Sequence, residues 1–284
     1  ISLRILETIY ASETFQQLFH IPKKNIAHSG IGLRLKHIEY VYFKRIFSHL
    51  ISFPTVTDVL FADKKISIRK IDSTIVNLSS KLLNVGLDIN AGKKSLKFGV
   101  EINGGIPVNI HLYEGQKYCS EDIALPELVR RNMEKSSTNI AIFDRGIHSK
   151  KTFIDFTKEN ISFISRATTQ DFKVLESHLV TEPLTETLLI RRDERVLFVH
   201  GAHDPKYPLR LITGTHKTTG EELTFLTNID FLSAPEITNL YRSRWEIETF
   251  FKFIKQELNF KHLLSRSENG IKVCMYLTMI VAIL

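Results

Sequence analysis

The chain has 284 residues, of which 43% are hydrophobic and 10% aromatic, so it is long enough to bury one large core or two ordinary ones. Its formal net charge of +7 and pI near 9.3 suit a polyanionic partner, although many basic proteins bind no nucleic acid. The two cysteines, Cys119 and Cys274, lie far apart, which excludes a disulfide scaffold and a paired-cysteine zinc site and indicates a reducing cytosol.

Residues 1–62 carry apolar positions at helical spacing, as in "LKHIEYVYFKRIFSHLI", and predict a small helical region. The stretch "IPKKNIAHSGIG" (21–32) interrupts it with the Pro, Gly and Ser residues typical of a loop. The basic residues of this region would suit DNA binding, but a solvated basic face is the simpler explanation of so few charges. The chain begins at Ile1 and ends at Leu284 inside an apolar run, so we expect it to be cut from a longer product and this region to be incomplete.

From Lys64 the hydrophobic period becomes that of β-strands. Three β-rich segments, "KISIRKIDSTIVNL", "KKSLKFGVEIN" and "IPVNIHLYEG", are separated by short turns and predict an antiparallel meander. A helix ("ALPELVRRNME"), a strand ("NIAIFD"), a second helix ("KKTFIDFTKEN") and a second strand ("ISFISRA") follow. Strands followed by strand and helix alternation predict a mixed sheet with helices packed on it.

The segment 169–232 is β-rich again and predicts two hairpins, one turned at Asp193 and one around Gly220. Ser233 then predicts the N-cap of a helix that continues to about Phe260. The predicted fold class is therefore α/β (α+β), and the chain divides into four segments: 1–62 helical, 63–168 the first part of the core, 169–232 the β-rich insertion, and 233–284 the second part of the core. The final apolar run, "VCMYLTMIVAIL", is too short to span a bilayer and predicts a buried helix with no membrane partner.

Two aspartates stand where chemistry is commonly placed. Asp72 lies at the end of the first β run, in "IRKIDST", and Asp144 closes the most apolar strand, in "NIAIFDRG". Functional groups of open α/β sheets gather at the carboxyl ends of strands. Each aspartate alone is equally explained as a turn or N-cap residue.

The helix "YRSRWEIETFFKFIKQELNF" (241–260) carries its charges in a narrow stripe beside an apolar face. An Arg244–Glu248–Lys252 ladder would explain the charges at a few tenths of a kcal/mol per pair, but gives no reason for Tyr241 and Lys255 to share the same line. The two alternatives, a salt-bridge ladder and a functional site, stay open on geometry alone. Trp245 is expected to pack against the sheet or the insertion.

Tyr241, Arg244, Glu248 and Lys255 form the pattern Y-x2-R-x3-E-x6-K, which resembles the signature of a group of bacterial insertion-sequence transposases of the DDE type. The strands "KIDST" and "IAIFDRG" resemble the family's two aspartate strands, "KFGVEINGGIPVNIHLYEG" resembles the strands between them, and "LRLITGTHKTTGEELTFLTNID" resembles its insertion before the glutamate helix. The resemblance covers residues 64–284. One departure is Ile147 followed by His148, where the family usually has an aromatic residue after "DRG"; we expect it to alter local packing only.

The resemblance implies a ribonuclease-H-like mixed sheet with flanking helices, and a β-rich insertion before the last catalytic helix. It implies that Asp72, Asp144 and Glu248 are catalytic and hold two Mg²⁺ ions, with Mn²⁺ as a possible substitute. Carboxylates suffice for such a site, because Mg²⁺ takes few protein ligands and completes its shell with water and phosphate oxygens. A pair of such ions activates a water or a 3′-hydroxyl and stabilises the departing oxygen of a phosphodiester.

The residues expected to contact DNA on this reading are Tyr241, Arg244, Lys252, Lys255 and Arg145. Tyr241 would support or stack on the DNA end, Arg244 would grip a phosphate in a bidentate manner, and Lys255 would act as a point charge. The implied partners are the terminal repeats of an insertion sequence, target DNA, and a second copy of the chain on paired DNA ends. The implied location is the bacterial cytoplasm, at the nucleoid.

The leading hypothesis is a DNA transposase that cuts at the ends of its insertion sequence and joins the 3′-hydroxyls to target DNA. Two alternatives remain open, namely a metal-dependent nuclease of the same fold without strand transfer and an inactive DNA-binding remnant of a transposable element. A glycosidase using two of the acids is disfavoured by the basic pI and by the cations beside Glu248.

Overall fold

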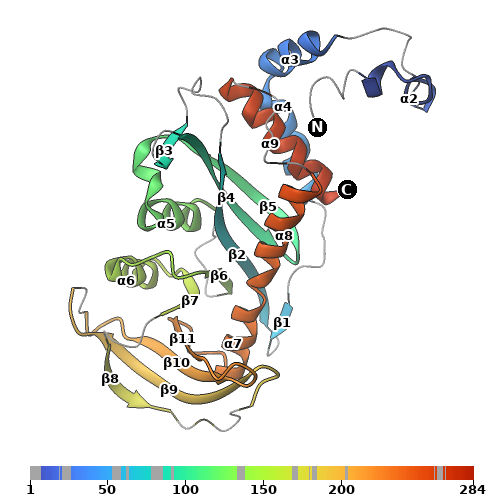
Figure 1. Ribbon diagram of the computed structural model, residues 1–284. Helices are drawn as coiled ribbons and strands as arrows, with labels where there is room; N and C mark the ends of the chain where they lie inside the picture. Colours follow the sequence, from blue (N-terminus) through green and yellow to red (C-terminus); the bar gives the residue numbers. More distant parts are fainter. Residues whose placement is uncertain are drawn as a thin grey trace.

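The computed structural model shows a long mixed sheet with helices on both faces (Figure 1). It describes residues 8–18, 20, 27–52, 59–61, 64–77, 86–90, 93–132, 138–167, 172–178, 180, 184–201, 204–258, 260, 265 and 267–284. The helices are α2 (Glu13–Leu18), α3 (His28–His37), α4 (Tyr40–Ser52), α5 (Glu121–Asn132), α6 (Lys150–Lys158), α7 (Ala234–Arg242), α8 (Trp245–Gln256) and α9 (Glu268–Ile283), with a 3₁₀ turn, η1 (Gln116–Cys119). The strands are β1 (Val59–Phe61), β2 (Lys64–Asn77), β3 (Leu87–Asn90), β4 (Lys93–Asn103), β5 (Ile106–Tyr113), β6 (Asn139–Phe143), β7 (Ser162–Arg166), β8 (Phe172–Ser177), β9 (Leu188–Phe198), β10 (Leu209–His216) and β11 (Glu222–Thr227).

The described strands form one sheet in the order β3-β4-β2-β6-β7-β11-β10-β9-β8, with β1 paired to β2 and β5 paired to β4. The pairs β2–β6 and β6–β7 are parallel, and the other pairs are antiparallel. The predicted mixed sheet with flanking helices is therefore confirmed, and the arrangement is consistent with a ribonuclease-H-like fold. The β-rich insertion is present as β8 to β11, and β11 joins it to the core sheet by pairing with β7.

Alternation along the central strands buries both faces of the sheet. In β6, Ile140 and Ile142 pack in the apolar cluster that includes α7, whereas Ala141 and Phe143 pack in the cluster that includes α5 and α6. Successive side chains of a strand point to opposite faces, so a strand with helices on both sides must be apolar throughout. A further cluster joins β4 and β5 to α4, α8 and α9. The predicted buried helix at the end of the chain is thus confirmed as α9, and no described helix is long and apolar enough to cross a bilayer.

The predicted turn at Asp193 is wrong. Asp193 lies in the middle of β9, and its carboxylate accepts two hydrogen bonds from the guanidinium of Arg210 on β10, at 2.8 and 2.6 Å. Arg210 also donates to the backbone oxygens of Ile229 and Leu232. A buried charge is tolerated in a strand when a bidentate partner satisfies it. The turn around Gly220 is confirmed, because Gly220 has a φ of +71° between the paired strands β10 and β11.

The long helix predicted from Ser233 to about Phe260 is divided into α7 and α8. The predicted N-cap at Ser233 is confirmed, and Ser233 forms a capping box with Glu236. At the junction the backbone amides bond three residues back rather than four, as from Arg244 N to the Tyr241 oxygen at 2.9 Å. The Ser243 hydroxyl donates to the Leu240 oxygen at 2.7 Å and so competes for a helical acceptor. The charge stripe expected on one helix therefore spans two helices and the tight turn between them.

Two smaller expectations for the first 62 residues also differ. The predicted loop at 21–32 overlaps α3, which begins at His28, while residues 21–26 lie outside the described part. Helix α3 lies beside α9, whose Asn269 donates to the backbone oxygens of Lys36 and Ile38. Long-range packing of this kind outweighs the loop preference of the two glycines. Strand β1, in the segment expected to be helical, pairs with the start of β2.

Candidate active site

The two predicted aspartates lie in the same row of adjacent parallel strands. Strands β2 and β6 pair in the register Ser67↔Asn139 to Lys70↔Ile142, and two residues further along, the same register sets Asp72 beside Asp144. Asp144 directly follows β6 and its side chain is exposed, whereas Asp72 is half-buried, because β2 continues past it to Asn77. Asp72 thus lies within its strand and not at its end, yet the strand pairing brings the two carboxylates together.

Tyr241 connects the end of α7 to this aspartate pair. Its hydroxyl donates to Asp144 Oδ1 at 3.3 Å, and its ring packs edge-on against Phe225 with the centroids 5.1 Å apart. The side chain is buried, and burial is the largest cause of the upward shift in the pKa of the phenol. In the DNA-free chain Tyr241 therefore contacts Asp144 and Phe225, and its contact with a DNA end stays a prediction.

Arg244, in the turn between α7 and α8, places a positive charge close to the carboxylates. Its guanidinium lies 2.5 Å from Glu248 Oε1 and 5.7 Å from the centroid of the Tyr241 ring, and only 13% of its side chain is exposed. Burial lowers the pKa of Arg244, but Tyr241, Glu248 and Asp144 more than compensate and raise it above its ordinary value. Among the described residues no hydrogen-bond partner meets its buried Nε.

The pKa of Asp72 is raised to about 6. Burial is the largest cause, and the charges of Glu121 and Asp144 add to it. The backbone N–H of Ser73 and the charge of Arg244 act in the opposite direction, without cancelling the increase. Negative charge thus accumulates here beyond what Arg244 neutralises, which is the electrostatic condition under which a carboxylate pair gains from a bound cation.

Glu248 lies on α8 and is 35% exposed. Helix α8 contacts β2, and a salt bridge of 2.8 Å joins Lys70 Nζ of β2 to Glu246 Oε2, two residues before Glu248. In the part of the chain that the structure describes, no group of three His, Cys, Asp or Glu side chains is close enough to hold a metal ion. Asp72 and Asp144 lie beside each other, whereas Glu248 forms a salt bridge with Arg244.

The donor set nevertheless fits a hard divalent cation. Asp72, Asp144 and Glu248 offer only carboxylate oxygens, which are the ligands that Mg²⁺ and Mn²⁺ accept. Asp72 lies on β2, and Asp144 follows the neighbouring strand β6. The Lys70–Glu246 bridge ties α8, which carries Glu248, to β2. The pKa of Asp72 is raised first by burial and further by the charges of Glu121 and Asp144, and an ion on Asp72 and Asp144 would offset both effects.

The remaining predicted residues are Lys252 and Lys255, on the same helix as Glu248, and Arg145. Lys252 is exposed on α8, and no ion pair joins it to Glu248 within the described residues, so only the first half of the predicted ladder forms. Lys255 Nζ lies 5.8 Å from the centroid of the Phe251 ring. Arg145 is exposed directly after Asp144 and lines a cavity of about 570 Å³ whose other basic residues are His148, Lys150 and Arg166.

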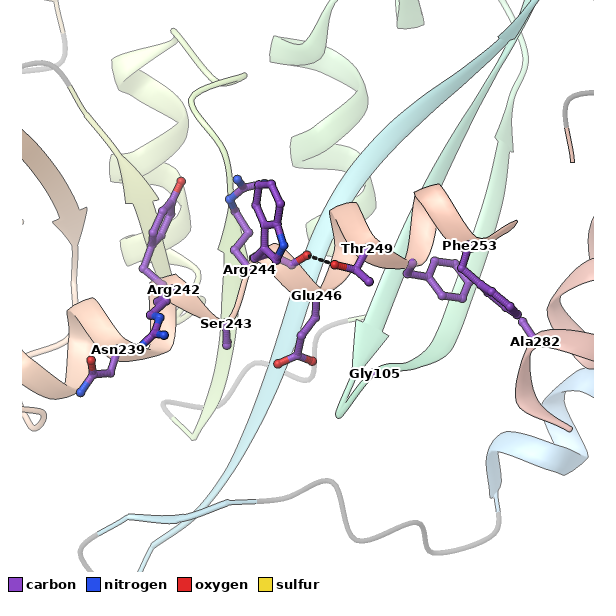
Figure 2. Close-up of a pocket in the computed structure, with 12 residues that line it drawn as sticks. Gly105, Asn239, Arg242, Ser243, Arg244, Glu246, Thr249, Phe253 and Ala282 are labelled. Carbon is purple, nitrogen blue, oxygen red and sulfur yellow. Dashed lines mark hydrogen bonds between the residues drawn. The ribbon is translucent and has the colours of Figure 1, made fainter. Parts of the chain in front are cut away.

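A second cavity, of about 980 Å³, opens along the α7–α8 junction (Figure 2). Asn239 and Arg242 lie toward one end of it, Arg244 and Glu246 lie in its middle part, and Phe253 and Ala282 lie toward the other end. Trp245 also lines this cavity and is 66% exposed, so the expectation that it packs against the sheet or the insertion is wrong. Ile147, in contrast, is buried among α5 and α6 and takes the position of the expected aromatic residue within the core.

Sequence reasoning missed two groups that support the site. Lys70 lies two residues before Asp72, on the same face of β2, and a lysine on a buried face of a strand signals a paired carboxylate. Glu121 influences Asp72 from the other side of the sheet, and no local pattern indicates that contact, because 48 residues separate Glu121 from Ser73, its partner.

Comparisons with known proteins agree with this geometry. Residues 63–284 match the family model described as a transposase DDE domain. Over 233 residues, the chain is 28% identical to a putative transposase for insertion sequence element IS4SA of Synechocystis sp., covering 78% of this chain and 59% of that protein. It is 36% identical over 73 residues to the putative transposase y4zB of Sinorhizobium fredii, covering 26% of this chain and 20% of that protein.

A third relative is the probable transposase for insertion sequence element IS5377 of Geobacillus stearothermophilus, 36% identical over 52 residues. That match covers 18% of this chain and 14% of the relative. The chain thus spans at most about three fifths of the length of the curated relatives it matches.

Proposed function

The chain belongs to the transposase DDE domain family, and from that premise we propose that it cuts phosphodiester bonds at the ends of an insertion sequence and joins the freed 3′-hydroxyls to target DNA. The observation that carries this proposal is the register of β2 and β6, which sets Asp72 beside Asp144, with Tyr241 bonded to Asp144. Two adjacent carboxylates with one raised pKa and a buried arginine nearby suit metal-assisted phosphoryl transfer.

Asp72, Asp144 and Glu248 would hold two divalent cations, Mg²⁺ or in its place Mn²⁺. Bound there, such ions supply Lewis-acid polarisation of the phosphate and a lowered pKa of the attacking hydroxyl. Tyr241 donates a hydrogen bond to Asp144 Oδ1 and thereby fixes the orientation of that carboxylate. The Lys70–Glu246 bridge holds α8, and with it Glu248, against β2.

Arg244 would exchange partners during this reaction. Without cations it neutralises Glu248, at 2.5 Å, and lies in the field of both Asp72 and Asp144. With cations on those carboxylates, the Arg244 guanidinium would be free to bind a DNA phosphate in a bidentate manner. The salt-bridge and functional readings of Arg244 and Glu248 then describe two states of the same residues.

We further propose that the chain belongs to the subgroup with the Tyr-Arg-Glu-Lys signature. Lys252, Lys255 and Arg145 would bind the phosphate backbone around the scissile bond, which gives affinity without sequence specificity. The DNA partners would be the terminal repeats of the element and a target duplex. A homodimer on paired ends and a location at the nucleoid stay predictions.

The test is cleavage and strand transfer on DNA that carries the element's own ends. Asp72→Ala, Asp144→Ala and Glu248→Ala should each abolish Mg²⁺-dependent cleavage, because each removes a ligand, while duplex binding measured by fluorescence anisotropy stays within about twofold of the wild type. Matched controls are Asp88→Ala and Glu257→Ala, which remove exposed carboxylates from β3 and from the end of α8 and should leave cleavage unchanged.

Retained cleavage in any of the three variants would contradict the assignment of that residue. Cleavage without joined products would favour the metal-dependent nuclease. Duplex binding without cleavage by the wild-type chain would favour the inactive remnant.

A further inference from the structure

Two acidic residues at the start of α5 contact the segments next to both aspartates, one through a side chain and one through the backbone. Glu121 and Asp122 are the first two residues of the helix. The Glu121 carboxylate faces β2, and the Asp122 carboxylate faces the segment that follows Asp144. Helix α5 packs on the face of the sheet opposite to α8. These contacts therefore come from the face of the sheet that does not carry Glu248.

Glu121 is fixed from two directions. Its Oε1 accepts a hydrogen bond of 2.7 Å from the Ser73 hydroxyl, and the same atom lies 2.9 Å from Lys97 Nζ. Lys97, 1% exposed, also donates to the Tyr118 backbone oxygen at 2.9 Å. A fully buried ammonium with these partners has little freedom to move, and it restricts the carboxylate in turn.

Ser73 links the fixed Glu121 carboxylate to the carboxylate of the preceding residue, Asp72. Side chains alternate along a strand, so Asp72 faces α8 while Ser73 faces α5. The Ser73 N–H donates to Asp72 Oδ1 at 2.7 Å, and its hydroxyl donates to Glu121. Ser73 is therefore held on one side by α5 and holds the Asp72 carboxylate on the other.

Asp122 acts on the segment after Asp144 in the same way. Its Oδ1 accepts hydrogen bonds from the backbone N–H groups of His148, at 2.6 Å, and Ser149, at 2.8 Å. Gly146 lies so close to α5 that an added Cβ would be 3.2 Å from Glu121 Cβ. The turn after Asp144 is thus pressed against the first turn of α5 and tied to it by two amides.

We propose that Glu121 and Asp122 are positioning residues that hold Asp72 and Asp144 at the separation a shared divalent cation requires. The inference rests on the proposed function, since it concerns the same two carboxylates. Like charges in one row repel each other, so their strands need an external restraint to stay in place before a cation binds. Residues that orient metal ligands commonly change metal affinity by 10- to 100-fold when removed.

The test is Mn²⁺ affinity of the DNA-free chain, measured from the electron paramagnetic resonance signal of free Mn²⁺ during titration. Ser73→Ala removes the Glu121 contact but keeps the Ser73 N–H bond to Asp72. Asp122→Ala removes both amide bonds, whereas Asp122→Asn keeps an oxygen that accepts them. We expect about tenfold weaker binding for Ser73→Ala and for Asp122→Ala, and affinity within about threefold of the wild type for Asp122→Asn.

The matched control is Arg131→Ala, which removes an exposed ion pair with Glu127 from the same helix and should leave Mn²⁺ affinity unchanged. If Asp122→Ala fails to fold, as judged by thermal unfolding in a chelator, Ser73→Ala carries the test, because it deletes a single hydroxyl.

Wild-type affinity in Ser73→Ala and Asp122→Ala, together with loss of binding in Asp72→Ala, would overturn the positioning role and leave the proposed function standing. Equal weakening in Asp122→Asn and Asp122→Ala would assign the effect to charge and also overturn it. Absence of Asp72-dependent Mn²⁺ binding in the wild-type chain would overturn both proposals.

Discussion

The surroundings of Asp72 disfavour the ionised form of its carboxyl group. Its pKa is raised to about 6, chiefly by burial and further by Glu121 and Asp144. Between the ordinary value of 3.8 and about 6, the folded chain binds more protons than the unfolded chain. The metal-free protein therefore loses stability as the pH rises through this interval, and above pH 6 it carries the full cost, on the order of 1–3 kcal/mol.

We predict that Asp72→Asn raises the midpoint of thermal unfolding at pH 7.5 in a chelator and changes it little at pH 4. The amide removes the charge and keeps an oxygen for the Ser73 N–H. Differential scanning calorimetry across this pH range measures the effect. Asp88→Asn, on an exposed pair with Lys94, is the control and should shift stability by less than about 0.5 kcal/mol at either pH. A stability gain equal at pH 4 and pH 7.5 would contradict the electrostatic explanation.

Tyr241 offers a separate test at the same scale. Tyr241→Phe removes the hydroxyl that contacts Asp144 Oδ1 and keeps the ring that packs on Phe225. We predict a roughly tenfold lower cleavage rate with a loss of stability of about 1 kcal/mol or less, because one neutral-to-charged hydrogen bond is removed and no cavity forms. Single-turnover cleavage and urea unfolding measure the two quantities. A much weaker affinity for DNA with an unchanged cleavage rate would instead indicate that Tyr241 contacts the DNA.

At the level of elements, α7 and α8 carry the signature residues on two helices joined by a tight turn. Tyr241 ends α7, Arg244 lies in the turn, and Glu248 belongs to α8. The turn aims Arg244 at Glu248 and brings Tyr241 to the end of β6. The four signature residues are therefore spaced across a junction of two helices and do not lie along one face of a single helix.

An ion pair with unequal burial joins α8 to β2, in addition to the apolar contacts between them. Lys70 is 5% exposed and Glu246 is 42% exposed. We predict that Glu246→Ala destabilises the protein by about 3 kcal/mol, because it leaves a buried ammonium without its partner, whereas the double variant Lys70→Met with Glu246→Ala recovers most of the loss. Urea denaturation of the two variants measures the difference. Equal destabilisation of the two would show that the pair itself, and not the unpaired charge, accounts for the effect.

At the scale of the whole molecule, the insertion extends the core sheet. Strand β11 pairs with β7, and the buried pair Arg210–Asp193 joins β9, β10 and the segment before α7. The insertion and the helix that carries Tyr241 are therefore parts of one cooperative structure. Two basic residues that line the cavity beside Asp144, Arg145 and Arg166, come from the carboxyl ends of the adjacent parallel strands β6 and β7.

The charge of +7 predicts a strong dependence of DNA affinity on salt. We expect the logarithm of the association constant to fall linearly with the logarithm of the salt concentration. Arg145→Ala should reduce the magnitude of that slope by about 1 and weaken binding several-fold at 100 mM salt. Fluorescence anisotropy with a duplex between 50 and 200 mM salt measures both.

Lys94→Ala is the control, because Lys94 is already paired with Asp88, and it should leave the slope nearly unchanged. An unaltered slope in Arg145→Ala would exclude a phosphate contact at that residue.

The sequence by itself determined the elements of the core and the identity of the candidate carboxylates. Apolar periodicity is a local property, so the strands around Asp72 and Asp144 and the helices α5 and α6 were predicted close to their observed bounds. The spaced pattern of Tyr241, Arg244, Glu248 and Lys255 gave the family, which the match over residues 63–284 confirmed.

Only the tertiary structure decided how these residues meet. The register of β2 against β6, the Arg210 partner that keeps Asp193 within a strand, and the break at Ser243 all depend on contacts between distant segments. So do the exposure of Trp245 and the contacts of Glu121 and Asp122 behind the aspartates. Burial and electrostatic environment are sums over neighbours that the chain brings together by folding, and a local pattern does not contain them.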